Sequence, residues 1–215
     1  WQMSRRKVFS STLCFLLLAA MLFPMAASAA ETSTFKGDSA DAYFSYYSDD
    51  GCIDRSVSVW VAEEMEHSPP GPPEKGTRVQ VYIFTADWCE GKQTYAFGEQ
   101  LLEGGEFQVD KKLDSASLNT TVAVTEEDWS SGAQRTFDVS IQLGWTGLGE
   151  VYNGYSMYRD KVGKCMYRYR YTGSNREAEP SGSISDGVID YAADASFSYG
   201  YLSSVKQGSV VVNCY

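Results

Sequence analysis

The feature that most constrains this chain is a period-two alternation of side chains in two neighbouring segments. Residues 57–61 (VSVWV) and 79–83 (VQVYI) place a valine or isoleucine on the same side of an extended backbone at every second position. The connection between them ends in residues 67–73 (HSPPGPP), and proline cannot donate a hydrogen bond to a sheet ladder. We therefore predict a long antiparallel hairpin in which Val57 lies opposite Ile83 and Val61 opposite Val79.

The same alternation continues towards the C-terminus. In residues 136–145 the apolar side chains, ending with Trp145, share one face, and Asp138 lies on the other, as in a strand buried on one side. We expect this segment to form a second hairpin with residues 117–125. Two glycines after it, Gly147 and Gly149, are expected to end the strand.

The other segments predict further short strands and very little helix. Residues 165–172 are expected to pair with residues 179–185 across Gly173, and one helical turn is expected at residues 99–103, after a short strand at 94–97. About eleven strands, spaced at roughly 8–15 residues with turns rich in Gly, Ser, Asp and Asn, predict an all-β fold. The expected architecture is an antiparallel β-sandwich or a jelly-roll-like barrel.

The N-terminal segment has the pattern of a signal peptide. Three basic residues, Arg5, Arg6 and Lys7, precede an apolar run at residues 8–23, and residues 27–29 (ASA) have the small-x-small form of a signal-peptidase site. The run is shorter than the about 20 apolar residues of a membrane span. We therefore expect residues 1–30 to be removed and residues 31–215 to form a single secreted or extracytoplasmic domain without a membrane span. A retained anchor helix and export through the twin-arginine route are the alternatives.

The charge of the chain excludes one class of partner. The chain has 18 Lys and Arg against 28 Asp and Glu, and its net charge is −10. Removal of the three basic residues of the signal peptide would leave a net charge of −13. A protein with this much negative charge would be repelled by phosphate backbones. We therefore expect no nucleic-acid partner.

Four cysteines remain after the predicted cleavage, and they favour two disulfide bonds. In the predicted hairpin register, the numbers of two directly opposite residues sum to 140, as for Val57 and Ile83. Cys52 and Cys89 sum to 141, so they are one residue out of register, and one bulge would bring them opposite each other. This predicts Cys52–Cys89 and, by elimination, Cys165–Cys214. A zinc site is disfavoured because no cysteine pair has C-x-x-C spacing and the single histidine, His67, is far from every cysteine in the sequence.

The sequence does not single out catalytic residues. Nucleophilic catalysis of the Ser-His-Asp or Cys-His type needs a positioned imidazole, and we expect His67 to sit in the proline-rich loop. Glycoside hydrolysis needs only two carboxylates, but no local spacing marks a pair. Calcium is the metal that the acidic turns would favour, although Asp-Gly is also ordinary turn chemistry and neither turn has a calcium-loop spacing, so we expect no cofactor. The residues of these turns are Asp49, Asp50, Asp54, Asp186, Asp190 and Asp194.

Aromatic residues are the best sign of a binding function. The chain has 15 tyrosines and 5 tryptophans, and Tyr167, Tyr169 and Tyr171 would line one face of a strand with Arg168 and Arg170 on the other. Such a tyrosine row can stack on sugar rings or anchor a protein partner, and it is our candidate binding site. The alternative is that these tyrosines pack in the interior of the sheet, since tyrosine favours strands for packing alone.

Several segments resemble a group of exported bacterial proteins of unknown function. The similar segments are residues 35–45, 68–72, 113–122 and 177–182, and the resemblance extends over nearly all of residues 31–215. It implies bacterial export and one β-rich domain, and it brings no functional residue with it. We therefore expect a non-catalytic exported module that binds a glycan or an extracellular protein through an exposed aromatic face. A structural or surface-associated domain and a glycoside hydrolase-like enzyme are the alternatives.

Overall fold

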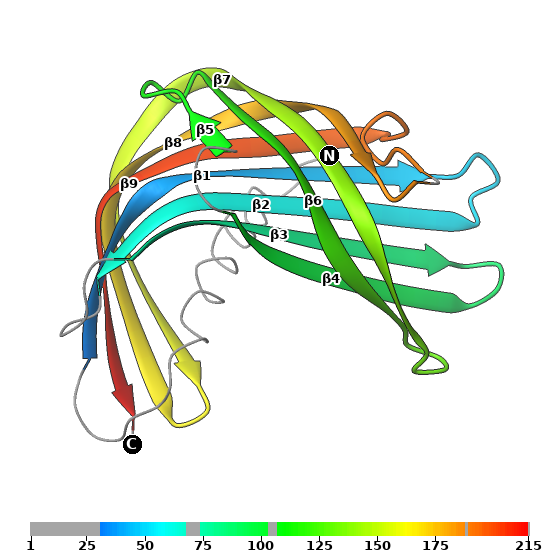
Figure 1. Ribbon diagram of the computed structural model, residues 1–215, viewed down its shortest axis with the longest axis horizontal. Coiled ribbons are helices and arrows are strands. Elements are labelled where there is room, and N and C mark those ends of the chain that lie inside the picture. The colour runs from blue at the N-terminus through cyan, green and yellow to red at the C-terminus, as the bar shows by residue number, and fades with distance from the viewer. Residues whose placement is uncertain (1–30, 68–73, 103–106, 188, 215) are drawn as a thin grey trace, which may run out of the picture.

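A computed structural model describes residues 31–67, 74–102, 107–187 and 189–214, and all their regular elements are β-strands (Figure 1). The described residues form nine strands, fewer than the eleven expected, because three of the strands each join two segments that were expected to be separate. Each strand is antiparallel to its neighbours. The strands are β1 (Glu31–Tyr47), β2 (Ile53–His67), β3 (Glu74–Asp87), β4 (Lys92–Leu102), β5 (Phe107–Val109), β6 (Ser115–Asp128), β7 (Gln134–Val162), β8 (Cys165–Ser185) and β9 (Phe197–Cys214).

The nine strands form a single sheet that closes on itself. Their order is β4-β3-β2-β1-β9-β8-β7-β6-β5, and β4 also pairs with β6. The closing contact is short, since it joins only residues 94–97 of β4 to residues 125–128 of β6, whereas β5 pairs with the other half of β6. The ring is therefore uneven, and the expectation of a sandwich of two sheets is wrong. Long strands with right-handed twist allow one sheet to curl until its edges meet.

The interior of the ring is filled by the alternating apolar side chains. Val57, Val59 and Val61 of β2 face inward together with Val139 and Ile141 of β7, and all five are essentially inaccessible to solvent. Trp145 is 1% exposed, as its position in the alternation indicates, and Asp138 on the opposite face is exposed. In Figure 1, β6 and β7 cross in front of β1 to β4, so the core lies between these two parts of the same sheet.

The register predicted for the hairpin of β2 and β3 is confirmed. Val57 pairs with Ile83 and Val61 with Val79. The disulfide Cys52–Cys89 is also confirmed, with a Cα–Cα distance of 5.2 Å. No bulge interrupts the β2–β3 ladder. The extra residue lies in the β3–β4 turn, where Trp88 donates its N–H to the carbonyl of Cys52 and Cys89 follows.

The helical turn expected at residues 99–103 is wrong for residues 99–102, which are extended. They belong to β4, which continues through Gly98 to Leu102. Residue 103 lies outside the described residues. A Cβ atom at Gly98 would lie 2.4 Å from the backbone oxygen of Ala123 on β6. The glycine therefore permits a close approach of β4 and β6 next to the closing contact, and it does not end the strand.

The hairpin expected across Gly173 is also wrong. Residues 165–172 and 179–185 belong to one strand, β8, which pairs with β7 on one side and β9 on the other. A Cβ at Gly173 would lie 2.4 Å from the backbone oxygen of Ser204, where β9 has an irregularity in its register. Gly147 and Gly149 likewise do not end β7, which runs on to Val162 through an irregularity between Leu148 and Tyr152.

Three such irregularities lie side by side and bend the sheet. They occur between Phe35 and Gly37 in the β1–β9 pairing, between Thr172 and Gly173 in β8–β9, and between Leu148 and Tyr152 in β7–β8. β-Bulges increase local twist and bend the strand that carries them. We call the part beyond them the extension; it consists of residues 31–36, 152–162, 165–172 and 206–214. Figure 1 shows that it curves away from the ring.

The described part of the chain contains no helix that is long and apolar enough to cross a membrane.

Candidate aromatic binding surface

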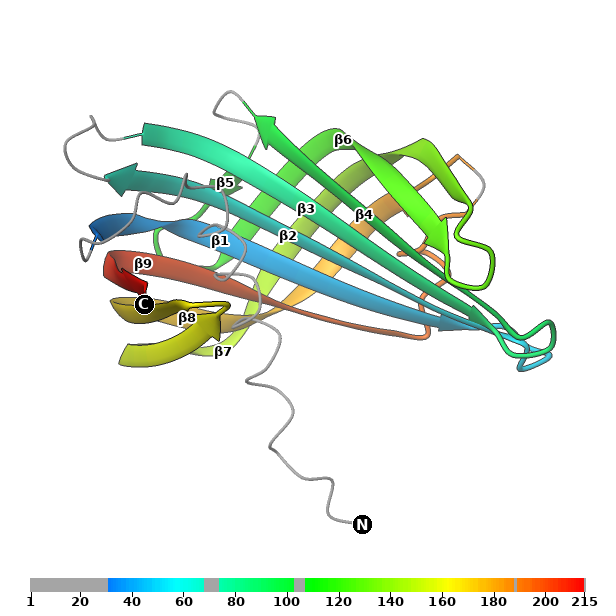
Figure 2. The same ribbon diagram turned by 90° about the horizontal axis from the view of Figure 1, so that it is seen from below.

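Aromatic side chains gather on the outer face of the sheet, the face that points away from the core. The paired registers align one row across five strands: Tyr199 (β9), Tyr43 (β1), Ser58 (β2), Tyr82 (β3) and Phe97 (β4). Each of these positions neighbours a core position along its strand, so its side chain points to the opposite face. Figure 2 shows these five strands side by side.

One group of rings lies over β9 and β1, and we call it the first aromatic group. Tyr43 and Tyr199 are stacked, with ring centroids 5.2 Å apart and planes at 29°. Phe197 lies 5.6 Å from Tyr199, and Tyr201 lies 6.4 Å from it in an edge-on arrangement. Phe197 is 56% exposed. These offset and edge-on geometries are the ones that aromatic quadrupoles favour, so the group holds its own shape.

The second aromatic group lies over β3 and β4. The centroid of Tyr82 is 4.9 Å from that of Phe97 and 6.2 Å from that of Tyr95. Trp129, from the turn between β6 and β7, lies 6.0 Å from Phe84 and is 58% exposed. The group therefore joins rings from two neighbouring strands with the ring of a turn that lies more than 30 residues further along the sequence.

A strip of two serines separates the groups. Ser56 and Ser58 lie on the outer face of the part of β2 that runs between the two groups. Neighbouring strands lie about 4.8 Å apart, so the backbones of Tyr43 and Tyr82 lie roughly 10 Å apart, with Ser58 midway. The surface thus presents two sets of flat apolar faces with short hydroxyl side chains between them.

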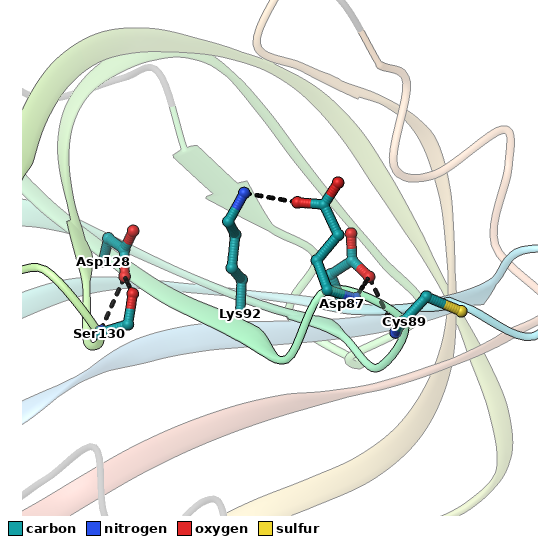
Figure 3. A network of polar contacts seen from close by, with 6 residues as sticks. Asp87, Cys89, Lys92, Asp128 and Ser130 are labelled. Carbon is teal, nitrogen blue, oxygen red and sulfur yellow. Dashed lines mark hydrogen bonds and ion pairs between the residues drawn. The ribbon is translucent and has the colours of Figure 1, made fainter.

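Carboxylates fix the turns that carry the exposed rings at the end of this surface. Asp128 Oδ1 accepts hydrogen bonds from the backbone N–H of Ser130 at 2.7 Å and from the Ser130 hydroxyl at 2.6 Å (Figure 3). These bonds lower the pKa of Asp128 to about 2. In the neighbouring turn Asp87 Oδ1 accepts from the N–H of Cys89 at 3.0 Å. Both turns are therefore held in place, and the disulfide Cys52–Cys89 ties the β3–β4 turn to the β1–β2 turn.

A polar row lies next to the aromatic row on the outer face. It runs Tyr201, Asp41, Trp60, Gln80 and Glu99 across β9, β1, β2, β3 and β4. Burial raises the pKa of Asp41 to about 7, although backbone hydrogen bonds, including one at Tyr201, act in the opposite direction. Gln80 is fully buried and donates from Nε2 to Glu99 Oε2 at 2.5 Å.

The carboxylates of this region are poorly arranged for hydrolysis. Asp41 and Glu99 lie three strands apart, roughly 14 Å between backbones, whereas glycosidases hold their two carboxyl groups about 5–9.5 Å apart. Glu177 of β8 is nearer to Asp41, since it pairs with Tyr201 in the intervening strand. Asp41 is only 6% exposed, however, so a substrate could not reach its carboxyl group in this conformation. The arrangement favours binding over catalysis.

The tyrosines selected from the sequence lie elsewhere. Tyr167, Tyr169 and Tyr171 share one face of β8 as expected, but this part of β8 belongs to the extension. Tyr169 is 4% exposed, and Tyr167 and Tyr171 are half-buried, as Tyr43 and Tyr82 also are. Two rings that are more than half exposed, Trp129 and Phe197, belong to the two aromatic groups. Tyr43 and Tyr82 were missed. The signal was present at Tyr82, because it lies between the core residues Val81 and Ile83 and must point outward.

The acidic turns considered for calcium use their carboxylates as turn caps. Asp50 Oδ1 accepts from the N–H of Cys52 at 3.0 Å, and Asp190 Oδ1 accepts from the N–H of Ala193 at 3.0 Å. Asp186 Oδ2 accepts from the hydroxyl of Tyr191 at 2.7 Å. Within the residues that the structure describes, no three His, Cys, Asp or Glu side chains are grouped as a metal site would require. His67, which was expected in the loop, is the last residue of β2, because that strand is longer than its alternating core segment.

The fold and surface together define an all-β domain with exposed aromatic groups on one closed sheet. No protein-family model, no curated protein and no solved structure matches this chain.

Proposed function

We propose that this chain is a non-catalytic, exported module that binds a glycan through the two aromatic groups of its outer face. The observation that carries the proposal is the row Tyr199, Tyr43, Ser58, Tyr82 and Phe97, in which rings on either side flank a short serine. Aromatic faces stack on the apolar C–H faces of sugar rings, and hydroxyl side chains bond sugar hydroxyls. The hydrogen-bonded strands of the sheet fix the spacing of both without rearrangement.

Export is supported by two independent features. The disulfide Cys52–Cys89 fits an oxidising compartment, where such bonds form and persist. The basic and apolar N-terminal pattern at residues 5–29 fits a signal peptide. The resemblance to exported bacterial proteins agrees with both. A second disulfide, Cys165–Cys214, belongs to the same proposal, because the β8–β9 register places these residues directly opposite each other.

The structural alternative has one observation in its favour. If the aromatic residues served only to pack the sheet, they would be buried, and Tyr169 is. Trp129 and Phe197 are not, since more than half of each side chain is exposed. Both exposed rings lie against further rings of the two aromatic groups, and contiguous exposed apolar area commonly marks a binding site.

A glycan array that includes insoluble polysaccharides tests the proposal. The wild-type protein would be compared with a Tyr43→Ala/Tyr82→Ala variant, one ring from each group. Tyr152→Ala serves as a matched control, because Tyr152 is 66% exposed but lies on β7 in the extension. Circular dichroism and thermal unfolding would verify that every variant is folded.

We expect the double variant to lose about 5- to 150-fold in affinity for the glycans that the wild type binds, since each stacked ring contributes about 0.5–1.5 kcal/mol. The control should bind as the wild type does. Equal binding by the double variant would show that the aromatic groups are not the site. No binding by the wild type would remove the glycan proposal and favour the structural alternative.

A further inference from the structure

The second half of the chain contains a hairpin whose charge is opposite to that of the rest of the protein. Residues 152–172, the ends of β7 and β8 in the extension, contain five basic residues and one acid, Asp160. The hairpin therefore carries +4 against −10 for the whole chain, which leaves −14 on all other residues. The five basic residues are Arg159, Lys161, Lys164, Arg168 and Arg170.

Four of these cations lie on one face of the hairpin. Arg159 of β7 is directly opposite Arg168 of β8, Met157 is opposite Arg170, and Lys161 is opposite Met166. Directly opposite residues share a face, and so do alternate residues along a strand. This face is the one opposite to Tyr167, Tyr169 and Tyr171. We call it the cationic face.

The pairing of Arg159 with Arg168 is unfavourable without a partner. Cβ atoms of directly opposite residues lie about 4.5–5.5 Å apart, and like charges at that distance repel. Arg159 and Arg168 are both exposed. Within the described part of the chain, no carboxylate forms a salt bridge with Arg159, Arg168 or Arg170. An anionic group held between the two guanidinium groups would relieve the repulsion and accept paired hydrogen bonds from both.

Exposed apolar side chains continue the cationic face along β7. Met157 is 55% exposed, and Tyr155, which is opposite Thr172, is 60% exposed. Arg168 and Arg170 are two residues apart on β8, about 7 Å along the strand. The face thus presents cations at regular intervals along a line that ends at an exposed aromatic ring.

We propose that the cationic face binds an acidic polysaccharide, a chain that carries carboxylate or sulfate groups on successive sugar rings. The arginines would hold the acidic groups and Tyr155 would stack on a ring. The proposal rests on the proposed function in that the ligand is a glycan, and it adds a second surface that selects the charged members of that class.

The observations favour a glycan over other anionic partners. A membrane-inserting hairpin carries apolar residues at its tip, but residues 160–164 (DKVGK) at this tip contain three charged side chains. A nucleic acid extends well beyond one hairpin, and its phosphates would meet the −14 charge of the remaining residues. A flexible glycan with acidic groups on successive sugar rings can lie along the hairpin and bend away from the acidic remainder of the domain. Figure 1 shows that the hairpin end, in yellow, points away from the ring.

The test uses two acidic polysaccharides, heparin as the sulfated probe and polygalacturonate as the carboxylated probe. Affinity would be measured at several salt concentrations for the wild type and for Arg168→Ala/Arg170→Ala. The matched control is Lys111→Ala/Lys112→Ala, which removes the same charge from two exposed lysines in the β5–β6 turn. Neutral glycans identified on the array would be measured with the same three proteins.

We expect the arginine variant to lose at least tenfold in affinity for an acidic polysaccharide and to show a weaker salt dependence, since two charge contacts are gone. The lysine control should change less than twofold. Equal losses in the two variants, or no acidic polysaccharide bound by the wild type, would overturn the proposal. So would displacement of the polysaccharide by a single-stranded oligonucleotide of equal charge, or tighter binding to vesicles of anionic lipid.

The two proposals fail in different ways. If only the cationic face is wrong, the arginine variant and the wild type bind acidic and neutral glycans alike. If only the aromatic groups are wrong, Tyr43→Ala/Tyr82→Ala binds neutral glycans as the wild type does, while the arginine variant still loses the acidic ones.

Discussion

The indole Nε1 of Trp145 on β7 donates a hydrogen bond to the backbone carbonyl of Asp41 on β1 at 2.8 Å, across 104 residues of sequence. The bond crosses the interior of the ring and joins its two crossing parts. Gly200 lies beside it, because a Cβ there would meet both the Asp41 oxygen and the Trp145 ring. The core is thus aligned by a directional contact as well as by apolar packing.

Replacement of Trp145 by phenylalanine should destabilise the fold through this contact. The change leaves the Asp41 carbonyl without its buried donor, and an unsatisfied buried group costs about 1–3 kcal/mol. The smaller ring adds to the loss. Urea unfolding of Trp145→Phe would measure the effect. Trp88→Phe is the control, since Trp88 is 61% exposed, and equal stability of the two variants would contradict the role assigned to Trp145.

Asp41 should make the stability of the protein depend on pH. Burial raises its pKa from 3.8 to about 7 in the folded state, so the folded protein retains a proton that the unfolded chain has lost. The resulting stabilisation is complete below about pH 4 and is lost as the pH rises to about 7. Asp41→Asn cannot ionise, so we expect it to gain stability relative to the wild type between pH 4 and pH 8.

Free energies of unfolding at pH 4, 6 and 8 would test the prediction for Asp41. Asp138→Asn is the control, because Asp138 is exposed on β7. A stability difference between wild type and Asp41→Asn that stays constant with pH would contradict the raised pKa.

Gly98 should be intolerant of a side chain. Its Cβ would lie 2.4 Å from the Ala123 oxygen and 2.9 Å from a methyl group of Val124, next to the short β4–β6 contact that closes the ring. Overpacking of this kind typically costs about 1–3 kcal/mol, so Gly98→Ala should lower the unfolding midpoint. Gly154→Ala is a matched control with no atom within 4 Å of the added carbon. Equal midpoints would show that the closing contact can yield.

The disulfide bonds give a prediction that needs no variant. Peptide mapping of oxidised protein should join Cys52 to Cys89 and Cys165 to Cys214, because β8–β9 pairing places the latter two opposite each other. A peptide that joins Cys52 to Cys165 would contradict both assignments. Loss of the Cys52–Cys89 bond, which spans 37 residues, should cost about 4 kcal/mol on the loop-entropy model. Thermal unfolding of Cys52→Ala/Cys89→Ala would measure this loss.

The local sequence pattern was sufficient to predict strand pairing wherever strands adjacent in the sequence are also adjacent in space. The alternation of residues 57–61 and 79–83 determined the pairing of Val57 with Ile83, because a shift by one residue would turn the core side chains outward. The same reasoning predicted the position of Trp145 in the core. Local pattern gave the wrong prediction at Gly98 and Gly173, where the strand was expected to end. Each glycine instead permits another strand to approach closely, and the neighbouring sequence does not distinguish such a glycine from one in a turn.

The sequence by itself determined the all-β class, the inward-facing residues and the disulfide Cys52–Cys89, since period-two patterning and hairpin register act over neighbouring segments. Only the tertiary structure decided that one sheet closes on itself, because the β1–β9 and β4–β6 pairings join segments far apart in the sequence, and no hairpin register specifies such partners. It also decided the candidate site. Tyr43 and Tyr199 lie 156 positions apart, and a strand pairing alone brings their rings to a centroid distance of 5.2 Å.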